Sequence, residues 1–317
     1  MNILGNIKKA LFGISLQETS CDKRGFIVSN PEIKQRLESI GQTFVFGYHT
    51  ALIYNDLERI AEELNRQIAL ENHGFAFEGA AMGLMLLDII SFQGPRRFNQ
   101  FVDTSGNAHF YMLHVGAGWA MARLPWRIQQ RVNSLDNLCH WLALDGFGFH
   151  QGYFHAKKFV EQQAQQKGLS GYALRVFDQG LGRSLWFVLG ADIQRITIQI
   201  NSFPQQRQAD LWAGIGLASS YAGGVDEADL KSLKHLSGEY SNNLSQGAAF
   251  AAKARERAGN PTEHTNLACV IFCNTNANTA ANICDQSLIN LPADTEIPAY
   301  EIWRQRIQNH LTLESVA

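Results

Sequence analysis

Glycines and aromatic residues interrupt the apolar runs of this chain at regular intervals, and this pattern predicts its architecture. Three stretches share the same mixture of glycine, alanine, aromatic and aliphatic residues: NHGFAFEGAAMG at 72–83, LDGFGFHQGYFH at 144–155 and AGIGLASSYAGG at 213–224. Corresponding glycines of successive stretches, and of the pieces that precede them, lie roughly 64–72 residues apart. A fixed period of this length is the sequence signature of a repeat protein, in which stacked units bury a shared core.

Comparison of the copies predicts the secondary structure better than any single copy does. Residues 195–200 (RITIQI) alternate between polar and apolar positions as a strand does. Their counterpart at 58–65 (ERIAEELN) has helical spacing and strong helix formers. Since the two segments occupy the same place in the repeat, we expect a helix at both. Each copy then consists of three helices, with loops marked by residues such as Pro125 and Pro261.

We therefore predict an all-α protein with about four helical repeats, packed as a superhelix or as an α/α-type array. We expect a single domain over residues 1–317. It consists of an N-terminal extension (1–40), three clear copies (41–91, 110–166 and 172–224), a decayed fourth copy (240–285) and a C-terminal tail helix within 286–317.

So many glycines inside helices need a physical cause, because glycine costs about 1 kcal/mol relative to alanine in a helix interior. Close packing of helix backbones is one explanation, since the missing side chain lets two helices approach. The other is a cavity in which a ligand comes close to the backbone. Both explanations fit the sequence.

Composition and charge exclude several classes of function. The chain has 27 basic and 29 acidic residues and no basic stripe, so nucleic acid is not an expected partner. Glycine-rich nucleotide-binding motifs, a nucleophile elbow and a zinc-protease helix motif are all absent from the sequence. We expect no membrane span. The N-terminus is basic and mildly amphipathic but does not match a signal peptide.

Five cysteines without a CxxC pair favour reduced thiols and a cytoplasmic protein. Cys269 and Cys273 are four residues apart and share one helix face, which would suit a metal or a redox pair. Burial as small apolar side chains is the alternative that we favour.

Candidate chemistry lies where one copy replaces a small residue by an ionisable one. Glu78 and His150 align with Ala218, His155 aligns with two glycines, and His49 aligns with Gly118. His114 and Asp178 share a further aligned position. The candidate catalytic residues are Glu78, His114, His150 and Asp178.

Imidazoles and carboxylates of this kind form the ligand set of non-haem iron or zinc. His150 and His155, however, would point about 140° apart on an ideal helix, so they could share an ion only if the helix were distorted. Asp178 has the alternative role of a helix cap. Non-haem iron is therefore a possible cofactor, and the sequence specifies none.

Aromatic residues recur on the same helices as these exceptions, and most of them are expected in the core. If the repeats enclose a hollow, the same side chains would form an apolar pocket for a long unsaturated hydrocarbon, with the ionisable exceptions as its polar points. The residues expected to line this pocket are His49, Phe77, Trp119, Phe149, Tyr153, His155 and Trp186.

Five longer runs resemble a known family: FEGAAM at 77–82, HVGAGWA at 114–120, DGFGFHQGYFH at 145–155, FDQGLGRSLW at 177–186 and IPAYEIWR at 297–304. They resemble the bacterial domain-of-unknown-function family 1702, an enediyne biosynthesis protein family. The resemblance extends from Gly25 to about Gln308. It implies a pathway in which an iterative polyketide synthase makes a linear polyene, and it implies no reaction or catalytic residue.

Two hypotheses follow from the residues and the resemblance together. In the first, the protein binds a hydrophobic polyene or polyyne intermediate and assists its oxidative tailoring, as an enzyme that could depend on a metal. In the second, it is a non-catalytic helical-repeat scaffold that docks on the polyketide synthase or on a tailoring enzyme. Convergence of Glu78, His114, His150 and Asp178 would favour the enzyme.

Overall fold

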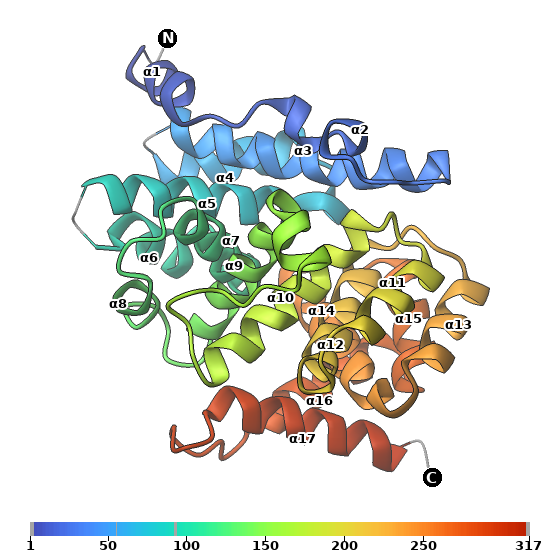
Figure 1. Ribbon diagram of the computed structural model, residues 1–317. Helices are drawn as coiled ribbons and strands as arrows, with labels where there is room; N and C mark the ends of the chain where they lie inside the picture. The colour runs from blue at the N-terminus through green and yellow to red at the C-terminus, as the bar shows by residue number, and fades with distance from the viewer. Residues whose placement is uncertain (1–2, 55, 92–93, 315–317) are drawn as a thin grey trace. The chain divides into compact units, whose positions relative to one another are not determined.

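The protein is built from helices alone in the part of the chain that its computed structural model describes, residues 3–54, 56–91 and 94–314 (Figure 1). Seventeen α-helices and several short 3-10 or π turns follow one another there without a strand. The predicted all-α class is confirmed. The chain forms two compact units: Met1–Gly25 with Gln35–Phe147, and Phe26–Lys34 with Gly148–Ala317.

The first unit holds the first two copies of the repeat, and each copy has the three helices that the sequence predicts. The N-terminal extension forms α1 (Ile3–Phe12) and α2 (Cys21–Arg24). The first copy comprises α3 (Pro31–Ile53), α4 (Leu57–Gln67) and α5 (His73–Ser91). After α6 (Arg96–Asp103), the second copy comprises α7 (Phe110–Arg123), α8 (Ile128–Val132) and α9 (His140–Phe154), whose last turns belong to the second unit.

The second unit holds the other two copies and the C-terminal helix. The third copy is α10 (Tyr172–Val188), α11 (Ile193–Ser202) and α12 (Gln205–Ala222). After α13 (Glu227–Ser237), the fourth copy is α14 (Ser241–Ala258), α15 (Glu263–Cys273) and α16 (Ala277–Leu288), and the chain continues into α17 (Ala299–Glu314). Residues 195–200 are helical within α11, as the comparison of copies predicts.

Aspartates at the same position of the first and third copies cap the middle helix of each copy. Asp56 caps α4 by accepting a hydrogen bond from the backbone N–H of Arg59, and Asp192 caps α11 through the N–H of Arg195. Each carboxylate satisfies a donor that the helix itself leaves open. In the second copy the equivalent helix α8 is preceded by Arg127, which has a left-handed backbone and makes no side-chain cap.

Glycines bring helix backbones together within the first unit. A methyl group at Gly47 of α3 would overlap the backbone carbonyl of Ala76 in α5, and one at Gly79 of α5 would overlap that of Phe44 in α3. α7 and α9 cross in the same reciprocal way at Gly118 and Gly146. Close packing therefore explains these glycines.

The second unit repeats this arrangement along α10, α12 and α14. Gly182 of α10 and Gly214 of α12 form one reciprocal pair, and Gly216 of α12 and Gly247 of α14 form the next. At each position the atom that a methyl group would meet is a backbone carbonyl on the neighbouring helix, which cannot move aside as a side chain can. α12 thus packs against one neighbour through Gly214 and against the other through Gly216.

One segment, Leu70–Ser91, is long and apolar enough to cross a membrane by length and composition. Eighty-nine per cent of its most apolar window is buried within the fold, which is how the core helix of a globular protein passes the same test. This segment contains α5, whose close contacts with α3 are those just described.

We expect Gly214→Ala to destabilise the second unit by about 3 kcal/mol, because the new methyl group forces α10 and α12 apart in a packed core. Gly259→Ala is the matched control, since Gly259 has a left-handed backbone but open space around its Cβ position. It should cost about 1 kcal/mol through backbone strain alone. Urea unfolding of the full chain measures both values, and equal losses would contradict the packing explanation.

Candidate functional site

Aromatic and histidine side chains gather around the C-terminal turns of α9. The rings of Phe149 and Phe187 are centred 5.3 Å apart, and those of Tyr153 and Phe26 are 5.1 Å apart. His150 packs on Phe154 at 4.7 Å. We name this group the α9 cluster, and its members are Phe26, Phe149, His150, Tyr153, Phe154, His155, Arg183 and Phe187.

The α9 cluster runs from the interior of the second unit to its surface. Phe149 and His150 are buried, Tyr153 and Phe154 are half-buried, and His155 is exposed. Apolar surface thus continues from a buried position to solvent, with imidazoles along its length. Aromatic rings in such a series offer faces and edges on which apolar groups can pack.

A buried cation lies inside the α9 cluster. The guanidinium of Arg183 is 5.1 Å from the centre of the Phe149 ring, and Arg183 is 5% exposed. A guanidinium over an aromatic face is attracted by the negative face of the ring, more strongly where water is excluded. The sequence predicted Phe149, His150, Tyr153 and His155 as site residues but not Arg183, although Arg183 stands in the run 177–186 that carries the family resemblance.

The end of α9 brings two predicted residues closer than an ideal helix would. α9 ends at Phe154, so His155 lies outside the regular helix, and the His150 and His155 rings are centred 6.3 Å apart. The divergence expected for an uninterrupted helix therefore does not apply. A single π-type turn, Lys157–Glu161, follows, and such turns often accompany functional sites in helices.

Asp178 holds the segment that follows this turn. Its carboxylate lies mid-way along α10, where it cannot cap the helix, and accepts a hydrogen bond of 2.8 Å from Nε of the buried Arg207. Nη1 of Arg207 donates to the backbone carbonyl of Gln163 at 2.7 Å. Burial raises the pKa of the Asp178 carboxyl, and Arg207 opposes that rise. Asp178 is therefore a positioning residue beside the site.

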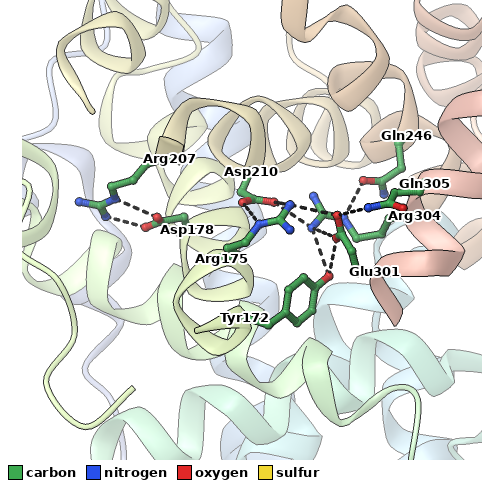
Figure 2. Close-up of polar contacts among 9 residues, drawn as sticks. All are labelled: Tyr172, Arg175, Asp178, Arg207, Asp210, Gln246, Glu301, Arg304 and Gln305. Atoms are coloured by element: carbon green, nitrogen blue, oxygen red, sulfur yellow. Dashed lines mark hydrogen bonds and ion pairs between the residues drawn. The ribbon is translucent and has the colours of Figure 1, made fainter. Parts of the chain in front are cut away.

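A second buried ionic group joins α17 to the repeat helices (Figure 2). Arg304 pairs with Asp210 of α12 at 2.8 Å and with Glu301 at 3.2 Å, while its Nε donates to Gln246 of α14 at 3.0 Å. Tyr172 of α10 donates its hydroxyl proton to Glu301 at 2.8 Å. We name these residues, together with Arg175 and Gln305, the α17 network.

The α17 network is a balanced set of charges rather than a reactive one. Asp210 and Glu301 face Arg304 and Arg175, with Arg175 Nε 2.9 Å from Asp210. Burial alone would raise the pKa of Glu301, but the two guanidiniums hold that pKa below its usual range. Four compensating charges fix the position of α17, which has no counterpart in the repeat.

Sequence reasoning missed most of this network, although a signal was present. Glu301 and Arg304 lie in the run 297–304 that carries the family resemblance. Arg207 and Asp210 stand three residues apart at the start of the otherwise small and apolar α12. Charged side chains in a helix that is buried along its length need partners of opposite charge. This requirement indicates Arg207 and Asp210 as members of buried ion pairs.

In the first unit, two predicted site residues are buried on neighbouring helices. His114 is buried on α7, where its Nδ1 lies 2.8 Å from the Phe110 carbonyl and its ring packs 5.4 Å from Phe98. Burial lowers the pKa of its imidazole. Glu78 is buried on α5, and its backbone carbonyl is the group that a methyl at Gly116 would meet.

The predicted pocket residues of the first unit are also packed against protein. Phe77 stacks on His109 at 4.1 Å, and Trp119 packs on Phe44 at 4.5 Å. Nε2 of His49 accepts a hydrogen bond of 3.2 Å from the backbone N–H of Ile14. In the second unit, Trp186 is fully buried and donates its indole N–H to the Gly223 carbonyl at 3.1 Å.

Throughout the described ranges, no three histidine, cysteine, aspartate or glutamate side chains lie close enough together to hold a metal ion. Cys269 and Cys273 are buried on α15, and the Cys273 thiol donates weakly to the Ser245 carbonyl at 3.3 Å. Hydrogen bonding with Cys269, together with burial, raises the pKa of Cys273 well above its usual value. The interpretation of these cysteines as small buried side chains is confirmed.

The profile of one protein family, described as "Protein of unknown function (DUF1702)", matches residues 3–311. The chain belongs to this family. The match spans both units and includes all of α1 and most of α17, and its description gives no activity. Searches of curated proteins and of solved structures returned no match.

We expect Asp178→Asn to destabilise the second unit by about 3 kcal/mol, because it leaves the buried Arg207 without its counter-charge. The double substitution Asp178→Leu with Arg207→Met should recover most of that loss, since it removes both charges. Urea unfolding measures the two effects. Backbone hydrogen exchange at 157–166 should stay faster in the double variant than in the wild type, because the bond to Gln163 is gone; unchanged exchange would contradict the positioning role.

We expect the stability of the first unit to fall as the pH drops below about 6.5. Burial, with a contribution from His73, lowers the pKa of His109 from 6.5 to about 4, so the unfolded state binds the proton first. The stability is complete above pH 6.5 and decreases as the pH approaches 4, by about 2 kcal/mol at pH 5. His109→Phe should flatten this dependence in urea unfolding, whereas His235→Gln, at an exposed position on α13, should preserve it.

Proposed function

We propose that this protein is an accessory protein of an enediyne-type polyketide pathway that binds a hydrophobic polyene or polyyne intermediate at the α9 cluster and assists its oxidative tailoring. The observation that carries the proposal is the α9 cluster itself. A run of aromatic rings passes from buried Phe149 to half-buried Tyr153 and Phe154, with His150 and Arg183 beside it.

The chemistry of a conjugated chain fits these side chains. A polyene is flat, apolar and polarisable, and aromatic rings offer faces and edges that pack on such a chain at little conformational cost. The imidazoles of His150 and His155 and the guanidinium of Arg183 supply the few polar points that orient a ligand with a polar end. These contacts support binding without a reaction at the same residues.

The placement of the other candidates favours a binding role over catalysis by the predicted set. The carboxylate of Asp178 is paired with Arg207, and the ring of His114 packs on Phe98 and Phe110. The tailoring step is then assisted by holding the intermediate in a water-poor site for a partner enzyme. Five free and buried cysteine thiols support the cytoplasm as the compartment of this proposal.

A linear conjugated tetraene fatty acid, whose fluorescence rises in apolar surroundings, tests the site directly. We expect saturable binding by the full chain and a Kd about tenfold higher for Tyr153→Ser or Phe154→Ser, because each removes an aromatic contact surface. Tyr240→Ser is the matched control, since Tyr240 is also half-buried in the second unit but lies outside the α9 cluster. Its Kd should equal that of the wild type.

Deletion of the gene in a producing host adds the pathway readout. The early polyene should accumulate without the enediyne core, and the Tyr153→Ser variant should restore less core than the Tyr240→Ser variant does. Unchanged core formation, or tetraene binding that none of the α9 cluster variants weakens, would contradict the proposal. Wild-type protein that binds no tetraene but captures the polyketide synthase would favour the scaffold hypothesis instead.

A further inference from the structure

The first helix presents an apolar face that none of the described residues of the first unit covers. Ile3, Leu4, Ile7 and Leu11 are 50–72% exposed and follow one side of α1. Gly5 lies on a different side, where it is buried against the backbone carbonyl of Ile53 at the end of α3. α1 therefore packs on the unit through its glycine side and leaves its long aliphatic side chains in solvent. We name those four side chains the N-terminal apolar face.

This face is held in place by specific hydrogen bonds. The carbonyl of Phe12, the last residue of α1, accepts from the hydroxyl of Tyr48 at 2.7 Å and from Nη1 of Arg123 at 2.8 Å. Two residues later, the N–H of Ile14 donates to His49. The end of α1 is thus fixed to α3 and α7, so the apolar face is a built surface of the unit.

Exposed apolar side chains are concentrated here. Within the described residues, five of the twelve exposed large hydrophobic side chains, these four and Leu16, belong to the first 16 positions. Single exposed apolar residues are ordinary, but a contiguous group marks a contact surface.

One cationic side chain borders this face. Lys8 lies beside the aliphatic residues on the helix, whereas Lys9 lies on the opposite side, near Gly5. Arg97 of α6 lies close enough to lower the pKa of Lys8 further after burial has lowered it, and Arg97 is itself paired with Asp88 at 2.9 Å. Positions 1–17 contain two lysines and no acidic residue, so this segment is positively charged. A short helix with aliphatic residues on one side, in a positively charged segment, is typical of segments that lie in the interface of a bilayer containing anionic lipid.

We propose that α1 docks this protein on the surface of an anionic lipid bilayer. Ile3, Leu4, Ile7 and Leu11 enter the boundary between headgroups and acyl chains, and Lys8 at the border of this face meets the anionic headgroups. A second protein copy fits less well, because a stable protein interface buries roughly 800 Å² on each partner and four side chains of a ten-residue helix supply much less. The proposal is independent of the α9 cluster.

Co-sedimentation of the full chain with vesicles tests this proposal. The wild type should sediment with phosphatidylcholine vesicles that contain phosphatidylglycerol and much less with phosphatidylcholine alone. Leu11→Glu should weaken the binding more than tenfold, because it removes one apolar side chain from the interface and adds a charge that the anionic surface repels. Lys8→Gln should weaken it about fivefold.

Ile198→Glu is the matched control, since Ile198 is 69% exposed on α11 of the second unit; it should bind vesicles as the wild type does. Far-UV circular dichroism checks that each variant is folded. If Leu11→Glu is not folded, Ile7→Gln takes its place.

Three outcomes overturn the proposal: no binding of the wild type to either vesicle, equal binding of the wild type and the two α1 variants, or a dimer of the wild type that Leu11→Glu converts to a monomer without any vesicle binding. The last outcome would identify a second copy as the partner.

Discussion

The close approach of helix backbones at paired glycines is the constraint on which the structure of each unit depends. A methyl group at Gly182 or Gly214 would overlap a carbonyl of the facing helix, so these crossings allow no other residue without a shift of backbone. Close approach also explains why these helices contain glycine although glycine lowers the stability of a helix interior. Because α12 uses Gly214 toward α10 and Gly216 toward α14, its position along both neighbours is set by two residues on one helix.

A scaffold of this kind leaves few places for polar chemistry. Helices that touch through glycine and alanine are buried nearly all round, as α12 is, and each ionisable side chain placed in them needs a partner of its own. The two groups of ionisable residues in the second unit solve this differently. Asp178 and the α17 network are neutralised within the protein, whereas the α9 cluster combines its cation and imidazoles with aromatic rings and reaches the surface.

The sequence predicts the elements of this fold well because the same local solution occurs several times. Residues 195–200 taken alone resemble a strand, and only their counterpart at 58–65 identifies the helix.

The site was predictable in part for a different reason. Phe149, His150, Tyr153 and His155 lie close together along one helix end, so spacing brings them together. The partners Arg207, Asp210 and Arg304 come from distant helices, and no periodicity reports which buried charges meet. For the same reason, Asp178 could be interpreted as a cap when it is an ion-pair partner.

The α17 network also determines the order in which the second unit can be completed. Tyr172 and Glu301 are 129 residues apart in sequence, and Arg304 reaches back to Asp210 and Gln246. During synthesis the third and fourth copies leave the ribosome before α17 does, and until then Gln246 lacks the guanidinium of Arg304 and Asp210 has that of Arg175 alone. Contacts this far apart in sequence form late. α17, which is made after the repeat helices, is therefore the element that closes the polar interior of the helices made before it.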